Sequence, residues 1–176
     1  MKIDRRAFLG GCALAMTATF PAVAASDDLR ALGLAKPAFA IEPELGLPDL
    51  AGNMHDVSDY AGKTVVVSFW ATWCAPCRKE MPTLARLGRE LGNEKFAVLA
   101  VNVGDGEDRI GAFIDEFDHQ GLTVLLDSDK AMPGTWYLRG LPVTYVLSPS
   151  GEVILAAIGE RVWDSPEMIA KLRDLS

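Results

Sequence analysis

Two cysteines separated by two residues follow directly after a strongly apolar stretch, and this arrangement constrains the fold more than any other feature of the sequence. Residues Val65–Trp70 read Val-Val-Val-Ser-Phe-Trp, which is typical of a buried strand. From Cys77 to Leu91, apolar residues recur at helical spacing. We therefore expect Cys74-Ala75-Pro76-Cys77 to form the turn between a central strand and a helix. Pro76 is tolerated there because the first helical N–H groups have no partner to lose.

The rest of the chain alternates between predicted strands and helices. The apolar run 96–101 predicts a second central strand, and residues 122–126 predict a shorter one. Apolar residues on one helix face lie between them, namely Ile110, Phe113, Ile114 and Phe117. A Ser-Pro-Ser-Gly turn joins 143–147 to 153–158 as a hairpin, and residues 164–167 can cap a last helix. Alternation first and a hairpin last predict an α/β fold with a mixed central β-sheet flanked by helices.

The first 25 residues have the composition of an export signal. A basic start with Arg5 and Arg6 is followed by a mostly apolar stretch and then by small residues. The paired arginines favour the twin-arginine type, so we expect export to the periplasm and cleavage near Ala24 or Ala25. An uncleaved membrane anchor and lipidation at Cys12 are the alternatives. Glycine, threonine and proline interrupt the apolar stretch, however, and its main part follows Cys12.

A single domain is expected after this signal. The chain of 176 residues fits one compact domain, with residues 26–48 interpreted as a leader and residues 49–176 as the domain itself. The net charge of −7 leaves no basic stripe that could neutralise phosphates. We therefore expect no nucleic-acid partner.

The close cysteine pair predicts redox chemistry. A cysteine at a helix start meets unpaired backbone N–H groups and the positive end of the helix dipole, and both favour the thiolate. We expect Cys74, at the outer edge of the turn, to be the attacking nucleophile and Cys77 to resolve the mixed disulfide. A metal site or an inert disulfide is the alternative. Structural zinc needs about four ligands and catalytic zinc about three, and neither His55 nor His119 lies at ligand spacing from the pair, so no metal or other cofactor is expected.

With its flanking residues, this cysteine motif resembles the thioredoxin superfamily, in particular its exported TlpA/ResA-type branch. The resemblance extends from about Pro48 to Ser176. Its ordered motifs are Phe69–Cys74, Glu80 with Pro82, Val101–Val103, Leu125–Asp127, Arg139–Leu147 and Gly151. It implies a thioredoxin-like fold with an N-terminal extension, in which residues 104–130 add a helix and a strand to the centre of the chain.

The resemblance also implies how the site would hold a client protein. Pro142 is expected to be cis and to face the cysteine turn. The backbone of Leu141 would then pair with an extended client segment, as in other cases of edge pairing. Trp73, Ala75 and Pro76 are expected to border that segment.

One position departs from the family pattern. Cytoplasmic thioredoxins typically bury an aspartate beneath the second cysteine as a proton acceptor, and Ser68 stands there in this chain. A serine hydroxyl does not take that proton at ordinary pH, so water or another carboxylate must accept it. Glu80 is a candidate, although we interpret it first as a surface acid of the helix. Trp136 and Tyr137 are interpreted as core residues, with a wall of the substrate groove as the alternative.

The resemblance favours an enzyme that reduces disulfides in exported client proteins. It suggests apocytochromes c and copper-site proteins as clients and a membrane thiol transporter as electron donor. The Ala-Pro pair between the cysteines does not set the redox potential, so an oxidant or an isomerase is the alternative. A second hypothesis is a copper-binding chaperone that holds the metal on Cys74 and Cys77, with Met81 as a possible further ligand. A peroxidase is a third, but the Pro-x-x-x-Thr-x-x-Cys arrangement of the peroxiredoxins does not occur in the sequence.

Overall fold

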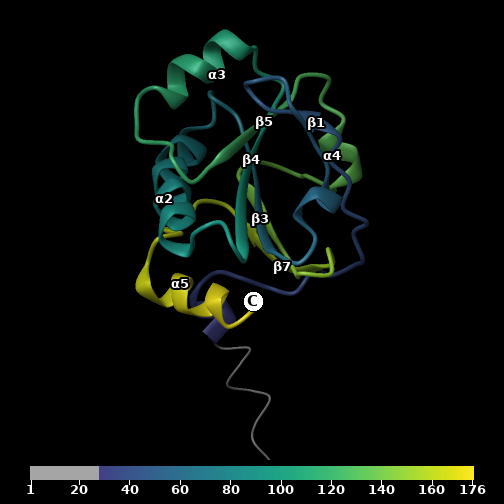
Figure 1. Ribbon diagram of the computed structural model, residues 1–176, viewed down its shortest axis with the longest axis vertical. Coiled ribbons are helices and arrows are strands. Elements are labelled where there is room, and N and C mark those ends of the chain that lie inside the picture. The colour runs from purple at the N-terminus through teal and green to yellow at the C-terminus, as the bar shows by residue number, and fades with distance from the viewer. Residues whose placement is uncertain (1–27) are drawn as a thin grey trace, which may run out of the picture.

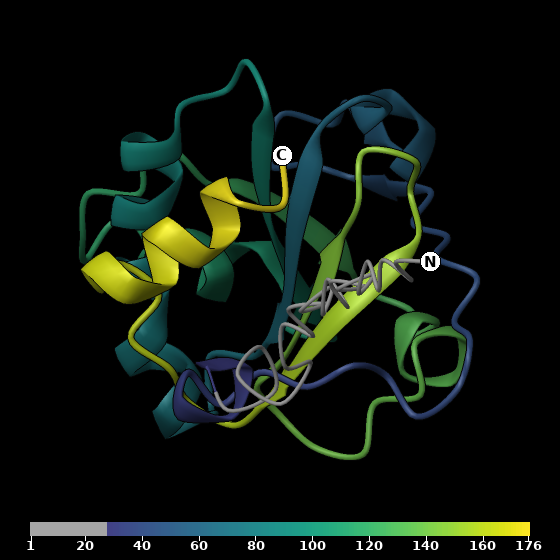
Figure 2. The same cartoon turned by 90° about the horizontal axis from the view of Figure 1, so that it is seen from below.

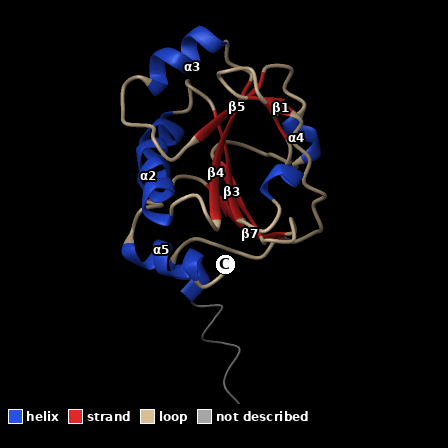
Figure 3. Cartoon of the chain, viewed as in Figure 1, coloured by secondary structure: helices blue, strands red, loops and turns tan. Residues whose placement is uncertain are grey.

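The computed structural model describes residues 28–176, and a five-stranded mixed sheet forms its centre (Figures 1 and 3). The strand order is β5-β4-β3-β6-β7. The strands are β3 (Thr64–Trp70), β4 (Phe96–Val103), β5 (Thr123–Asp127), β6 (Val143–Leu147) and β7 (Val153–Ile158). Strands β3, β4 and β5 run parallel to one another, β6 runs antiparallel to β3, and β7 runs antiparallel to β6. The predicted α/β fold with a mixed sheet between helices is confirmed.

Helices cover both faces of this sheet (Figure 2). On one face lie α2 (Ala75–Leu91) and α5 (Pro166–Arg173), and α3 (Glu107–Ile114) packs at the upper end of the same side in Figure 1. On the other face lie the short helix α4 (Met132–Thr135) and the two-stranded ribbon of β1 (Leu47–Pro48) and β2 (Met54–His55). A single 3-10 turn, η1 (Val57–Tyr60), follows that ribbon.

Strand β3 is buried on both faces, which explains its unbroken apolar sequence. Successive side chains point to opposite sides of a strand. Val65, Val67 and Phe69 therefore join the core on the α4 side. Val66 and Trp70 join the core under α2, and Ser68 points the same way. A polar side chain at that depth needs a hydrogen-bonding partner, and α2 supplies it, as described below.

The predicted elements agree closely with the observed ones. The hairpin of residues 143–147 and 153–158 is found with these bounds, and the Ser165 side chain caps α5 by accepting a hydrogen bond from the Met168 N–H. Helix α3 ends at Ile114, earlier than its apolar periodicity suggested, although the rings of Phe113 and Phe117 still pack 5.4 Å apart. Elements of two to four residues, such as β1, β2 and α4, were not predicted because they are too short to show a period.

The segment interpreted as a leader packs against the domain, beginning with the partly buried Leu29 and Leu32. The Leu34, Ile41 and Leu45 side chains are buried in the two cores. The Ala35 backbone pairs with Ala156 of β7. This segment therefore covers parts of both faces of the sheet.

The predicted export signal, residues 1–25, lies outside the residues that the structure describes. Within residues 28–176, no helix has both the length and the apolar character that a membrane crossing requires.

Candidate functional site

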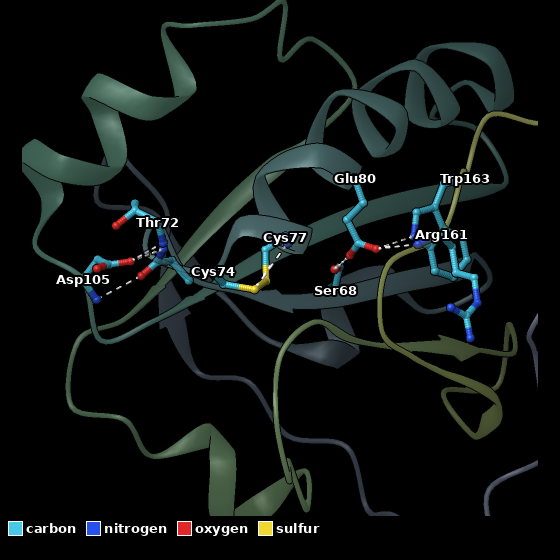
Figure 4. The surroundings of a disulfide bond; sticks show 9 residues. Ser68, Thr72, Cys74, Cys77, Glu80, Asp105, Arg161 and Trp163 are labelled. Atoms are coloured by element: carbon cyan, nitrogen blue, oxygen red, sulfur yellow. Dashed lines mark hydrogen bonds between the residues drawn. A yellow bond between two sulfur atoms is a disulfide. The ribbon is translucent and has the colours of Figure 1, made fainter.

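The two cysteines form a disulfide at the first turn of α2 (Figure 4). Their sulfur atoms lie 2.00 Å apart. Cys74 is the N-cap residue, and its sulfur accepts a hydrogen bond from the Cys77 N–H at 3.3 Å. Cys74 is 5% exposed and Cys77 is fully buried, so Cys74 is the more accessible residue of the pair. The predicted redox pair is thus present as a bond that exchange chemistry can open and close.

The helix start supplies positive polarity at the Cys74 sulfur. The first N–H groups of a helix have no intrahelical partner and carry the positive end of the helix dipole. The Cys77 N–H is one of these groups and points at the sulfur. Once the disulfide is reduced, the same N–H can stabilise a Cys74 thiolate.

The loop before β6 lies at the same end of the sheet as the cysteine turn. The Leu141–Pro142 peptide bond is cis, as the family resemblance implied. In the β3–β6 ladder, Phe69 is paired with Val143, so Pro142 lies opposite the end of β3, from which the cysteine turn departs. The Pro142 carbonyl accepts a hydrogen bond from Gly159 at 2.9 Å, which ties this loop to the end of β7.

The residues predicted to border a client differ in exposure. Trp73 is 70% exposed and Ala75 is also exposed, whereas Pro76 and Leu141 are half-buried and Pro142 is buried. An additional apolar side chain, Ile158 at the end of β7, is 76% exposed beside Val143. The end of the sheet that carries the cysteines therefore presents apolar side chains to solvent.

The interpretation of Glu80 as a surface acid is wrong. Its side chain is 1% exposed and lies between α2 and the sheet. The spacing contained the signal, because Glu80 lies three residues after Cys77 and four before Leu84, both on the buried face of the helix. A carboxyl group on that face of the helix is therefore expected to be buried.

Buried hydrogen bonds hold the Glu80 carboxyl on both oxygens (Figure 4). The Ser68 hydroxyl donates to Oε1 at 3.1 Å. The Arg161 backbone N–H and the Trp163 indole N–H donate to Oε2 at 3.1 and 3.4 Å. Burial raises the pKa of Glu80 to about 7, more than these hydrogen bonds lower it. Ser68, which cannot accept a proton itself, thus orients a carboxyl that exchanges one near neutral pH.

A second buried carboxyl, Asp105, lies on the opposite side of the disulfide in Figure 4 and was not identified from the sequence. It accepts hydrogen bonds from the Thr72 backbone N–H at 2.7 Å and from the Asn102 amide at 3.0 Å. Asn102 lies near the carboxyl end of β4, opposite Trp70 of β3 in the parallel ladder. Polar residues at the carboxyl ends of neighbouring parallel strands meet at one edge, which was the signal for finding this pair.

The charged residues next to Cys77 have their own partners. The Arg78 guanidinium pairs with Glu116 of the α3 side at 2.8 Å and lies 4.3 Å from the centre of the Phe113 ring. Lys79 is 3.8 Å from Glu160 and mostly exposed. Arg78 therefore fastens α2 to α3.

The remaining residues singled out from the sequence lie elsewhere. His55 contacts Asp49 at 3.1 Å and the Tyr60 hydroxyl at 2.7 Å, and His119 is exposed. Met81 is buried in the core under α2. Among residues 28–176, no three His, Cys, Asp or Glu side chains are grouped so as to hold a metal ion.

The two aromatic residues before Pro142 have different environments. Trp136 is a core residue, as interpreted from the sequence, and its indole N–H donates to the Glu44 carbonyl at 2.7 Å. Tyr137 was also interpreted as a core residue, and this is wrong. It is half-exposed with a φ of 53°, and its ring lies 4.8 Å from the ring of Phe39, which is itself half-exposed.

Known proteins are similar to this chain in sequence and in fold. The sequence profile of the AhpC/TSA family matches residues 40–156. The thiol-disulfide oxidoreductase ResA of Bacillus subtilis is 31% identical over 166 residues, which cover 90% of this chain and 88% of ResA. A solved structure described as the thiol:disulfide interchange protein DsbE of Chlorobium tepidum is 26% identical, with a TM-score of 0.68 over 78% of this chain and 99% of that one. The exposed lipoprotein thioredoxin Etrx1 of Streptococcus pneumoniae is 25% identical, with a TM-score of 0.65 over 75% and 99%.

Proposed function

Because the chain belongs to the AhpC/TSA family and is a thiol–disulfide oxidoreductase of the ResA type, we propose that it reduces disulfides of exported client proteins. The observation that carries this proposal is the Cys74–Cys77 disulfide at the start of α2, with Cys74 slightly exposed, Cys77 fully buried and a buried carboxyl that follows one helical turn later. Each of the three groups has a distinct part in dithiol–disulfide exchange.

In the first step, the Cys74 thiolate attacks a client disulfide. The Cys74 sulfur forms a new S–S bond with one client sulfur, and the other client sulfur leaves as a thiolate that takes a proton from solvent. The Cys77 N–H lowers the free energy of the attacking thiolate because it already points at the Cys74 sulfur. The exposed Trp73 ring and the backbone of Leu141 border the cysteine end of the sheet and hold the client segment.

In the second step, Cys77 attacks the Cys74 sulfur of the mixed disulfide. This forms the Cys74–Cys77 bond seen in the structure and releases the client as a dithiol. Cys77 must lose its proton first, and a buried thiol does so reluctantly. Glu80 lies one turn further along α2 with a pKa of about 7, so its ionised form can take that proton near neutral pH.

The two electrons given to the client must be restored by a dithiol donor. Reduction of the Cys74–Cys77 bond by a second dithiol returns both cysteines to thiols and leaves that donor as a disulfide. A membrane thiol transporter fits this part, because the periplasm has no soluble nicotinamide-driven reductase for the task. Apocytochromes c and copper-site proteins, whose function needs reduced cysteines, are the clients that we propose.

The proposed compartment follows from the N-terminal pattern. Arg5 and Arg6 precede an apolar stretch and small residues, which supports twin-arginine export and cleavage near Ala24 or Ala25. One structural relative is described as an exposed lipoprotein and a more distant one as a secreted disulfide oxidoreductase. Export in the folded state suits a domain whose redox pair forms within one helical turn.

A trapping variant tests the client and the compartment together. With Cys77→Ser in the full-length chain, expressed in its own cell, the first step should proceed and the second should not. Client proteins should accumulate as mixed disulfides on Cys74 in the periplasmic fraction, to be identified by mass spectrometry after thiol blocking.

The matched control is the double variant Cys74→Ser, Cys77→Ser, which should capture nothing. Adducts that form equally in this control, or adducts found only with cytoplasmic proteins, would overturn the proposed client class. The absence of any adduct in the single variant would contradict the proposed first step.

A further inference from the structure

The Asp105 carboxyl is buried beside the cysteine turn and takes no part in the steps described above. It is 6% exposed, at the point where the chain leaves β4. One of its oxygens accepts both the Thr72 backbone N–H at 2.7 Å and the Asn102 side-chain amide at 3.0 Å. The Asp105 N–H in turn donates to the Asn102 side-chain oxygen at 3.0 Å. Asn102 and Asp105 are thus joined by two hydrogen bonds, one to the Asp105 carboxylate and one from the Asp105 backbone N–H, and the same carboxylate oxygen accepts from the backbone of Thr72.

This carboxyl is held in its charged form. Burial would raise the pKa of Asp105, but hydrogen bonds from Thr72 and Asn102, together with the Arg109 guanidinium, hold it below its ordinary value. Arg109 is exposed and lies 3.5 Å from the other oxygen. A buried carboxylate is unfavourable unless hydrogen bonds compensate it, and here the bond to the active-site loop is the shortest of those bonds.

The bond to Thr72 holds the short piece of backbone that joins β3 to α2. Only Trp73 separates Thr72 from Cys74, and the Trp73 side chain is too exposed to anchor the loop by packing. The one backbone hydrogen bond within the turn runs from the Cys74 N–H to the Ala71 carbonyl at 3.1 Å. The Asp105 contact therefore adds a polar anchor two residues before the N-cap position of α2, next to the packing of Ala71 and Cys74 in the core.

We propose that Asp105 is a positioning residue of the redox site: its carboxylate anchors the Thr72 backbone and thereby places the Cys74 sulfur against the Cys77 N–H. The substrate chemistry assigned to Cys74 rests on the proposed function, whereas the placement of its sulfur does not. Without the hydrogen bond from Thr72 to Asp105, the Cys77 N–H donates to the Cys74 sulfur for a smaller fraction of the time, and the Cys74 thiolate is less stable. A residue that only closed the loop between β4 and α3 would leave the acidity of Cys74 unchanged.

Two substitutions separate the hydrogen bond from the charge. Asp105→Asn and Asp105→Ala both remove the negative charge, which by itself makes a nearby thiolate more stable. In the asparagine variant, the side-chain oxygen can still accept from Thr72 and Asn102, and its amide faces Arg109 at the surface. In the alanine variant, the Thr72 N–H has no acceptor. Any difference between the two variants therefore reports the anchor.

The measurement is the pH dependence of iodoacetamide alkylation of Cys74 in the reduced protein. The Cys74 pKa of Asp105→Ala should lie about one unit above that of Asp105→Asn, which is about tenfold less thiolate at neutral pH. Asp105→Asn should match the unsubstituted protein or lie slightly below it. In parallel, amide hydrogen exchange of Thr72 should accelerate in the alanine variant alone. Asp108→Ala, which removes a neighbouring exposed carboxylate from the first turn of α3, should change neither quantity.

Circular dichroism at the assay temperature checks that each variant is folded. Should Asp105→Ala be unfolded, Asn102→Ala serves instead, since it frees the carboxylate from its partner; it should raise the Cys74 pKa in the same direction. Equal pKa values for Cys74 in the alanine and asparagine variants, with Thr72 exchange accelerated only in the alanine variant, would overturn the positioning role. Alkylation needs no client, so this test can succeed even if the chain fails to reduce protein disulfides, and the reverse also holds.

Discussion

Replacement of Cys74 by serine should lower the turnover of a protein disulfide by at least about a thousandfold, because a neutral hydroxyl cannot replace the thiolate nucleophile. Insulin reduction driven by dithiothreitol measures this turnover as the appearance of free thiols. Cys77→Ser should lose multiple turnover as well, yet its Cys74 should still react once with a small disulfide. The two cysteines thus differ in the step that they carry, although both are required.

The third cysteine provides the matched control for this experiment. Cys12 lies within the predicted export signal, so Cys12→Ser should leave turnover by the full-length chain unchanged. Substantial residual turnover in Cys74→Ser would contradict the assignment of the nucleophile. Single-turnover reaction by Cys74→Ser but not by Cys77→Ser would mean that the two roles are reversed.

The second large effect is expected from Glu80→Gln. If Glu80 accepts the proton of Cys77, its loss should slow the release of client from the mixed disulfide by about a hundredfold, in the usual range for a general base. Glutamine can keep the buried hydrogen bonds, since its oxygen can accept from Arg161 and Trp163 while its amide donates to Ser68. The expected loss therefore reflects the missing proton acceptor, with the packing retained.

The pH profile separates this role from a structural one. Burial raises the pKa of Glu80 to about 7, so the rate of client release should rise through that pH in the unsubstituted protein. In Glu80→Gln this inflection should vanish, and the rate should follow the Cys77 thiol alone. Glu90→Gln, which changes an exposed acid of the same helix that pairs with Arg173, should retain the inflection. An unchanged profile in Glu80→Gln would show that water accepts the proton.

Glu80 should also make stability depend on pH in an unusual direction. The folded protein binds the Glu80 proton more tightly than the unfolded chain does, because the pKa rises from 4.5 to about 7 on folding. This contribution is fully present below about pH 4.5 and is lost as the pH rises through 7. Since one pKa unit corresponds to about 1.4 kcal/mol, the free energy of unfolding should fall by about 3 kcal/mol over that range relative to Glu80→Gln. Urea unfolding of both proteins at several pH values measures the difference, and parallel curves would contradict the buried position of the carboxyl.

The sequence was sufficient for the main architecture because long apolar patterns are set by burial. The run Val65–Trp70 could only be a central strand, and the cysteine turn had to follow it before a helix. The hairpin of β6 and β7 was readable from its turn residues. Short elements such as α4 have no such pattern, and their formation depends on tertiary contacts, for example the Asp127 carboxylate that accepts from the Ala131 and Met132 N–H groups.

The candidate site was predictable for the reacting atoms but less so for the groups around them. The two-residue spacing of Cys74 and Cys77 identifies them as a redox pair from the sequence alone. Buried carboxyl groups are rare, and Glu80 was therefore interpreted as a surface acid. Its burial depends on Ser68 and on the Arg161–Trp163 loop, whose donors lie 81 and 83 residues away in the chain. The Asp105 contact with Thr72 likewise joins positions that only the sheet brings together.

Cys74 and Cys77 should exchange reversibly between a dithiol and a disulfide, and the pair should act as a reductant. Equilibration of the protein with glutathione buffers of graded ratio, followed by acid quenching, maleimide blocking and mass spectrometry, measures this directly. We expect one two-electron transition, confined to these two cysteines, with a midpoint nearer to about −270 mV, the thioredoxin value, than to about −120 mV, the DsbA value. A midpoint near the DsbA value, or no transition at all, would contradict the account.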